Sequence, residues 1–118
     1  METVKWIVDP SKIDVLRDMQ KYSAEPVIST LVGMFLESTP VALEKMKTDL
    51  ENNELLNIAK EAHKLKSNCG SLGLTSMAEL FASMEESIRK GGPINLVEAL
   101  ATAEKYFSQS KLYLTELK

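Results

Sequence analysis

Residues 62–74 read AHKLKSNCGSLGL, and they decide how the chain is organised because they contain its only histidine, His63. Apolar residues on both sides of His63 recur every three or four positions, which is the spacing of one face of an amphipathic helix. These residues are Leu55, Ile58, Ala62, Leu65, Cys69 and Leu72. At about 100° per residue, His63 points roughly 130° away from the centre of this apolar face. The pattern therefore predicts a helix that buries one face and exposes His63 to solvent or to a partner.

The side chains expected beside His63 on the exposed face are mostly small. At helical spacing they are Leu56, Ala59, Ser67 and Gly70. Lysines border the patch at Lys60, Lys64 and Lys66. An accessible imidazole of this kind suits a nucleophile that accepts a phosphoryl group, because the lysines can balance the arriving oxyanion charge. The lysines also disfavour the imidazolium form, so we expect a neutral ring near pH 7, with the Lys66 ammonium over it.

The pattern His63-x-Leu65-Lys66, followed by Gly70 and Gly73-Leu74, resembles the phosphoacceptor motif of histidine-containing phosphotransfer (HPt) domains. Residues 35–40, which read FLESTP, resemble the family's preceding helix, so the likeness covers nearly the whole chain. The resemblance implies a four-helix bundle whose histidine takes phosphate from one receiver-domain aspartate and passes it to another. By this likeness His63 is the phosphoacceptor, reacting through Nε2, and Lys66 stabilises the phosphate. Gly70 and Gly73 match the glycines that end the helix and turn the chain.

The same resemblance implies the partners of the chain. They are response-regulator receiver domains and a hybrid sensor histidine kinase. No cofactor is expected on this chain, and the Mg²⁺ for the reaction is expected from the receiver. The expected docking surface around His63 consists of Leu56, Ala59, Lys60, Lys64, Ser67 and Gly70.

Ser67 departs from the family pattern, which usually has glycine four residues after the histidine. Its hydroxyl could hydrogen-bond the imidazole or the phosphate, or it could crowd the approach of a receiver. Ser67 therefore keeps a second interpretation open, in which the chain is a helical adaptor that binds receivers through the same face and carries no phosphate. A purely structural bundle is a third and weaker interpretation.

The inventory of reactive residues argues against metal binding and against independent catalysis. The chain has one histidine and one cysteine, with no carboxylate pair at ligand spacing near them. We find no second base to orient His63, no glycine-rich phosphate loop and no nucleotide-binding motif. The sequence thus predicts a phosphocarrier rather than an enzyme.

Length and composition predict one soluble domain over residues 1–118. The chain is 44% hydrophobic and 26% charged, with a net charge of -3 and a pI near 5.2, so it lacks the basic field that nucleic-acid binding needs. Cys69 cannot form an internal disulfide and is expected to be a small buried residue. No apolar run approaches the roughly 20 residues of a membrane span, and the N-terminus does not resemble a signal peptide. We therefore expect a cytoplasmic protein that makes no membrane contact, and a monomer.

Breaks in the periodicity predict an all-α chain, since no segment alternates with the period of a strand. The expected helices begin at Asp9-Pro10, at Pro26, at about Glu54, at a Ser76-x-x-Glu79 capping box and after Asn95. Asp9 is expected to cap the first of them and Asn95 the last. The first is short and ends near Tyr22, the second reaches Asn52-Asn53, the third ends at Asn68 or Cys69, and Gly91-Gly92-Pro93 ends the fourth. Four longer helices with short connections favour an antiparallel up-down bundle, with the short N-terminal helix capping one end.

The second of these helices contains Pro40, yet its apolar stripe keeps its phase across Thr39-Pro40. We expect one long kinked helix there, although a break with Thr39 as cap is the alternative. A second stripe on this helix, Val27, Met34 and Val41, is expected to pack under the N-terminal helix. The alternative is that part of it extends the docking surface beside His63.

Overall fold

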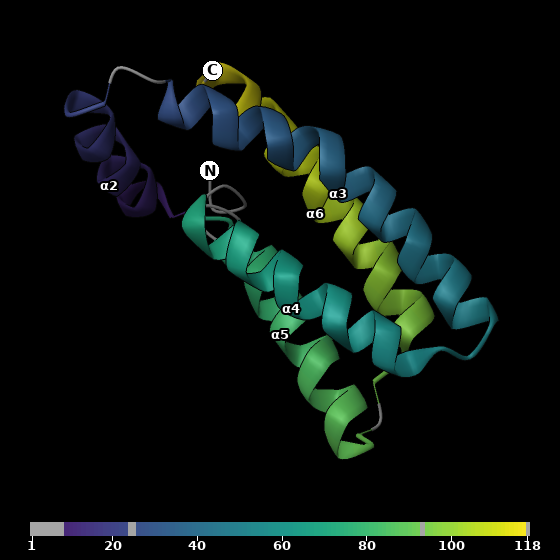
Figure 1. Ribbon diagram of the computed structural model, residues 1–118. Helices are drawn as coiled ribbons and strands as arrows, with labels where there is room; N and C mark the ends of the chain where they lie inside the picture. The colour runs from purple at the N-terminus through teal and green to yellow at the C-terminus, as the bar shows by residue number, and fades with distance from the viewer. Residues whose placement is uncertain (1–8, 24–25, 93, 118) are drawn as a thin grey trace.

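The computed structural model describes residues 9–23, 26–92 and 94–117, and in these ranges it contains five helices and no strand (Figure 1). The helices are α2 (Pro10–Lys21), α3 (Val27–Glu51), α4 (Leu55–Ser71), α5 (Thr75–Lys90) and α6 (Leu96–Leu117). The all-helical prediction is confirmed for this part of the chain. The N-terminal residues that were assessed for a signal peptide lie outside it.

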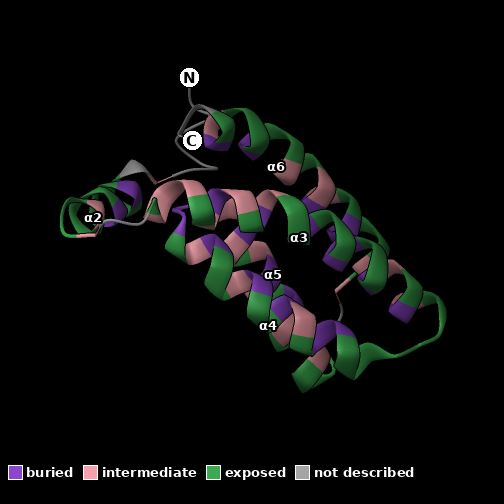
Figure 2. Ribbon diagram, turned by 45° about the horizontal axis from the view of Figure 1, so that its top comes forward, coloured by how far each residue is buried: buried purple, intermediate pink, exposed green. Residues whose placement is uncertain are grey.

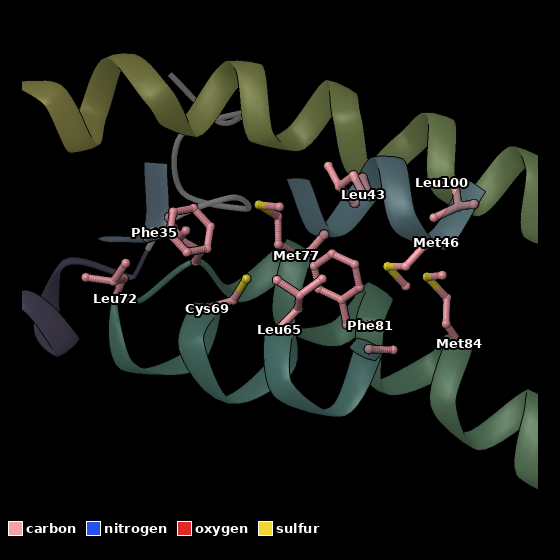
Figure 3. Packing of buried hydrophobic residues seen from close by; sticks show 14 of the residues in the cluster. Phe35, Leu43, Met46, Leu65, Cys69, Leu72, Met77, Phe81, Met84 and Leu100 are labelled. Atoms are coloured by element: carbon pink, nitrogen blue, oxygen red, sulfur yellow. The ribbon is translucent and has the colours of Figure 1, made fainter. Parts of the chain in front are cut away.

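The four longer helices pack around one apolar core. The closest association is between α4 and α5, and α3 packs against both α6 and α4, while α5 also contacts α6 (Figure 1). The buried residues form inward-facing stripes on these helices (Figure 2). In the close view, Phe81 of α5 lies between Leu65 of α4 and Met46 of α3, so the three helices share one packed centre (Figure 3). This core fixes which face of α4 is left outside.

The short helix α2 is held against the end of α4 by a glycine turn. Asp9 caps α2 as expected, with its Oδ1 accepting from the Ser11 backbone N–H at 3.0 Å. The Asp9 backbone N–H in turn donates to the carbonyl of Gly73. Gly73 has φ +75°, and a Cβ there would collide with the Asp9 carbonyl oxygen. Only glycine suits this position, because it needs both a left-handed conformation and close backbone contact.

The expectation that Gly70 ends the histidine helix is wrong. Helix α4 continues to Ser71, and Gly70 lies within its last turn. These two or three further helical residues lead into Leu72, which is only 2% exposed and lies in the core. The carbonyls at the helix end accept from the N–H groups of Leu72, Gly73 and Leu74. Gly73 alone therefore turns the chain.

Helix α3 runs without a break through Pro40, which confirms the prediction of one long helix. Phe35, Thr39, Ala42 and Met46 are buried along its inner face, so the same stripe continues on both sides of the proline. Pro40 itself is exposed, where a ring without an N–H disturbs the core least. Thr39 is an interior residue of the helix and does not cap it.

By length and composition, α3 is also long and apolar enough to cross a membrane, contrary to the expectation from the sequence. A core helix of a soluble protein passes the same test, and the inner face of α3 packs against α4 and α6. The composition of α3 is therefore weak evidence for a membrane span.

The N-termini of α5 and α6 test two predicted helix caps. Asn95 caps α6, because its Oδ1 accepts from the Glu98 backbone N–H at 3.0 Å. The prediction of a capping box at Ser76 is wrong, since α5 already begins at Thr75 and Ser76 lies inside the helix. Leu74 precedes the first turn and is fully buried. The start of α5 is thus anchored by an apolar side chain instead of a polar cap.

Candidate functional site

His63 lies on the solvent-exposed side of α4, as its position relative to the apolar face predicts. Its side chain is 58% exposed, whereas Ile58, Ala62 and Leu65 on the inner face are buried. The inner face of α4 packs in the core of the bundle, and this packing fixes the backbone position from which the ring projects. One edge of the imidazole is therefore accessible to another molecule.

The other edge of the imidazole contacts a carboxylate from α5. His63 Nδ1 lies 3.1 Å from Oε1 of Glu85 and 3.0 Å from Oε2. The expectation that the chain has no second group to orient His63 is thus wrong. Glu85 comes directly after the buried Met84, as His63 comes directly after the buried Ala62. Both side chains emerge at the edge of the contact between α4 and α5, and only the pairing of these helices brings them together.

Glu85 also binds two cationic side chains. Lys66 Nζ lies 3.2 Å from Oε1, and Arg89 Nε lies 3.1 Å from Oε2. Lys66 was expected over the imidazole, but its ammonium is bound to the carboxylate beside the ring. The hydrogen bond from His63 chiefly lowers the pKa of the Glu85 carboxyl, and those from Lys66 and Arg89 add to it against the effect of burial, so that its pKa falls from 4.5 to about 2. Glu85 is therefore ionised at neutral pH.

An ionised carboxylate can only accept hydrogen bonds, so the ring nitrogen that faces it carries the proton. In the neutral imidazole this places the proton on Nδ1 and leaves the lone pair on Nε2. The geometry thus provides one defined tautomer with Nε2 available as a nucleophile. A carboxylate at Nδ1 also stabilises the positive charge that develops on the ring when Nε2 forms a bond.

Most residues expected around His63 are accessible, but Ala59 is not. Leu56 is 62% exposed, and Lys60, Lys64 and Ser67 are also exposed. Gly70 is half-buried. Ala59 is fully buried, so its expected place on the exposed face is wrong. The closely packed α5 widens the buried face of α4 beyond the stripe of larger apolar residues, and alanine fits there because it is small.

Ser67 does not contact the imidazole in this structure. Its hydroxyl donates to the backbone carbonyl of His63 one turn earlier, at 3.4 Å. This is a common arrangement for serine inside a helix, and it turns the hydroxyl back toward the helix backbone. The hydrogen bond from Ser67 to the imidazole that the sequence left open is therefore not formed here.

A groove of about 880 Å³ lies next to this face, between α2, α3 and α4. Its lining includes Val15, Met19, Met34, Ser67 and Gly70. A second groove of about 520 Å³, lined by Met34, Ser38, Val41 and Glu61 among others, follows α3 and α4 away from α2.

Met34 and Val41 on the second stripe are 62% and 69% exposed. The expectation that they pack under the N-terminal helix is wrong, because α2 lies only at the end of the bundle where α3 begins (Figure 1). An apolar surface therefore extends from these residues toward the small side chains on α4.

Two further observations concern the reactivity of the cysteine and the possibility of metal binding. Cys69 is buried in the core, as predicted, and burial raises the pKa of its thiol to about 12, so it remains a protonated and unreactive thiol. Within residues 9–23, 26–92 and 94–117, no three His, Cys, Asp or Glu side chains are grouped so that they could hold a metal ion.

Comparison with known families agrees with the helical fold. The Hpt domain family model matches residues 30–118. The match covers most of the chain and includes His63, Lys66 and Glu85, so the chain belongs to the Hpt domain family. Neither the curated proteins nor the solved structures gave a significant match. Family membership gives the chain a role in histidine phosphotransfer within phosphorelays, in which Hpt domains act as phosphocarriers.

Proposed function

We propose that this chain is a phosphorelay intermediate that accepts a phosphoryl group on His63 from a receiver-domain aspartate and passes it to a second receiver. The observation that carries this proposal is the bond between His63 Nδ1 and the Glu85 carboxylate, which leaves Nε2 as the accessible nucleophile. The exposed face around the ring supports the proposal, because a receiver must bring its aspartyl phosphate in line with Nε2.

In the forward step the Nε2 lone pair attacks the phosphorus of the aspartyl phosphate. A P–N bond forms, the P–O bond to the aspartate breaks, and the receiver carboxylate leaves with the bonding electrons. The ring now carries a substituent on Nε2 and a proton on Nδ1, so it is cationic. Glu85 stabilises this charge through Nδ1, and Lys66 can turn its ammonium toward the phosphoryl oxygens. The reverse step returns the phosphoryl group to a receiver.

The partners follow from this chemistry. Receiver domains and a hybrid sensor histidine kinase would dock on Leu56, Lys60, Lys64, Ser67 and Gly70, and on the exposed Met34 and Val41 beside them. The receiver would supply the Mg²⁺ that neutralises its own aspartyl phosphate. On this proposal the chain is a phosphocarrier without catalytic activity of its own.

The finer architecture that we propose is an antiparallel up-down four-helix bundle, with α2 as a cap on one end. The packing of α3 on α4, α4 on α5, α5 on α6 and α6 on α3 supports this arrangement. We also propose that the domain is a cytoplasmic monomer that binds no nucleic acid, as the acidic net charge of -3 and the cytoplasmic setting of Hpt domains suggest.

Acid-labile phosphate incorporation tests the proposal. Wild type and His63→Gln are incubated with phosphorylated receiver domains and Mg²⁺, and the transferred label is followed. Label on the wild type alone, with receiver binding retained by both proteins, is the expected result. The adaptor interpretation also predicts that both proteins bind a receiver, but it predicts that neither of them takes up label.

A further inference from the structure

The Glu85 carboxylate is held on both of its oxygens. Oε1 accepts from Lys66 Nζ at 3.2 Å, and Oε2 accepts from Arg89 Nε at 3.1 Å, while both oxygens lie close to His63 Nδ1. The side chain of Glu85 is only 14% exposed, whereas Lys66 and Arg89 are 36% and 47% exposed. Two independent cations thus hold one carboxylate against the ring.

The two cations differ in the element that carries them. Lys66 lies on α4, one turn after His63, on a long flexible side chain. Arg89 lies on α5, one turn after Glu85 itself, so it approaches the carboxylate from the same helix. Its guanidinium is planar and always charged. A phosphoryl group that arrives at Nε2 can therefore attract Lys66 directly. It affects Arg89 only through Glu85.

We propose that Arg89 is a positioning residue that keeps Glu85 on His63 Nδ1 while Lys66 leaves Glu85 for the phosphoryl group. This inference rests on the proposed function, because it assumes that a phosphoryl group arrives on Nε2. A phosphoryl dianion attracts an ammonium more strongly than a carboxylate that already has other donors. Without Arg89, the departure of Lys66 would leave Glu85 with the ring as its single partner. In that case the phosphoryl group and Glu85 would compete for the same Lys66 ammonium.

His63 is the only histidine, so its ring can be observed directly by nitrogen NMR. The protein is phosphorylated with phosphoramidate, which needs no receiver: Nε2 attacks phosphorus, the P–N bond of the reagent breaks, and ammonia leaves. The Nδ1–H signal and its exchange with water are measured before and after phosphorylation. The variants are Arg89→Ala, Arg89→Lys and Lys66→Ala. The matched control is Lys90→Ala, which removes a pair of the same spacing, Lys90 to Glu86, that does not touch His63.

We expect Arg89→Ala to keep the protected Nδ1–H before phosphorylation, because Lys66 still holds Glu85. After phosphorylation its exchange should become faster than in wild type and Lys90→Ala by roughly ten-fold, the scale of one lost charge-assisted hydrogen bond. Arg89→Lys should restore most of the protection, and Lys66→Ala should keep it in both states.

Equal exchange in phosphorylated Arg89→Ala and Lys90→Ala would overturn the inference. Loss of the signal in Arg89→Ala or Lys66→Ala before phosphorylation would overturn it as well, since neither cation would then hold Glu85 by itself. Failure of every receiver to label the wild type would instead contradict the proposed function, and this NMR experiment does not depend on a receiver.

Discussion

Glu85 is the residue that gives His63 a defined chemistry. Without a partner, an exposed imidazole exchanges between two tautomers, and only one of them offers the Nε2 lone pair. The carboxylate at 3.0 to 3.1 Å from Nδ1 selects that form. Burial of most of the Glu85 side chain keeps it at the edge of the core, where its bonds are less screened than those of a fully exposed pair. The orientation of the imidazole is thus set by a residue far from it in sequence.

Replacing Glu85 with glutamine should change how stability depends on pH. The folded pKa of Glu85 is about 2, below its ordinary 4.5, so the unfolded chain binds more protons between these values and stability rises with pH there. We expect Glu85→Gln to unfold at lower urea concentration than wild type above pH 4.5, and the difference to shrink as the pH falls toward about 2. Urea unfolding between pH 7 and pH 2 measures this. A difference that is the same at every pH would contradict the assignment.

Replacing Ser67 with glycine should be tolerated by the site or should speed transfer. The hydroxyl bonds the His63 carbonyl at 3.4 Å and not the ring, so its removal clears space without removing a contact of the nucleophile. Glycine is less favourable than serine inside a helix by about 0.5 kcal/mol, and urea unfolding should detect this small loss of stability. The initial rate of label transfer from a phosphorylated receiver measures the effect on function. A large loss of phosphorylation would show that the hydroxyl is needed.

At the level of secondary structure, the two glycines at the end of α4 have different roles, although the sequence suggested that both end the helix and turn the chain. Gly70 lies in the last turn of the helix, and a Cβ there would meet no atom within 4 Å. Gly73 has φ +75° and contacts the backbone of Asp9, so it joins the end of α4 to the start of α2. The difference depends on the placement of α2, which local spacing does not contain.

Alanine substitution should separate these roles. We expect Gly73→Ala to lower the free energy of unfolding by about 1 to 3 kcal/mol, because its conformation is strained and the Cβ collides with Asp9. Gly70→Ala should raise it by about 0.5 to 1 kcal/mol, because alanine favours the helix and finds open space. Urea unfolding of both variants checks the prediction, and equal effects of the same sign would refute it.

At the scale of the whole molecule, the packing of α2 and α3 on α4 places an apolar surface next to Ser67 and Gly70, on the helix that carries His63. Met34 and Val41 remain exposed, although residues at helical spacing are more often part of a core. Together with the grooves along α3 and α4, they extend the small-residue patch into a surface that a partner can cover. Recognition and chemistry would then occupy adjoining parts of one face.

A charge at Met34 should weaken docking without harming the fold. We expect Met34→Asp to reduce the affinity for a receiver by roughly ten-fold, since it places a charge in an apolar contact. The control is Val97→Asp on α6, because Val97 is 71% exposed and belongs to another helix. Calorimetric titration with a receiver, together with urea unfolding of each variant, measures both properties. Equal affinities of the two variants would place the docking surface elsewhere.

The sequence by itself determined the helices, the apolar faces and the exposure of His63, because periodicity and chain breaks are local properties. It predicted the Asp9 and Asn95 caps and the continuity of α3 through Pro40, and each is confirmed. It predicted a cap at Ser76 that does not form, because the buried Leu74 anchors the start of α5 instead. Local side-chain chemistry was outweighed there by packing.

Only the tertiary structure decided which groups surround His63. The partner of its Nδ1 comes from α5, 22 residues away in sequence, and the same close pairing of α4 with α5 buries Ala59. Contacts of this kind depend on which helices pack together and on their relative rotation, and these follow from the packing of the whole core. The sequence thus determined that His63 is exposed on its helix and predicted it as the nucleophile, while the fold determined the orientation of its ring and the residues accessible beside it.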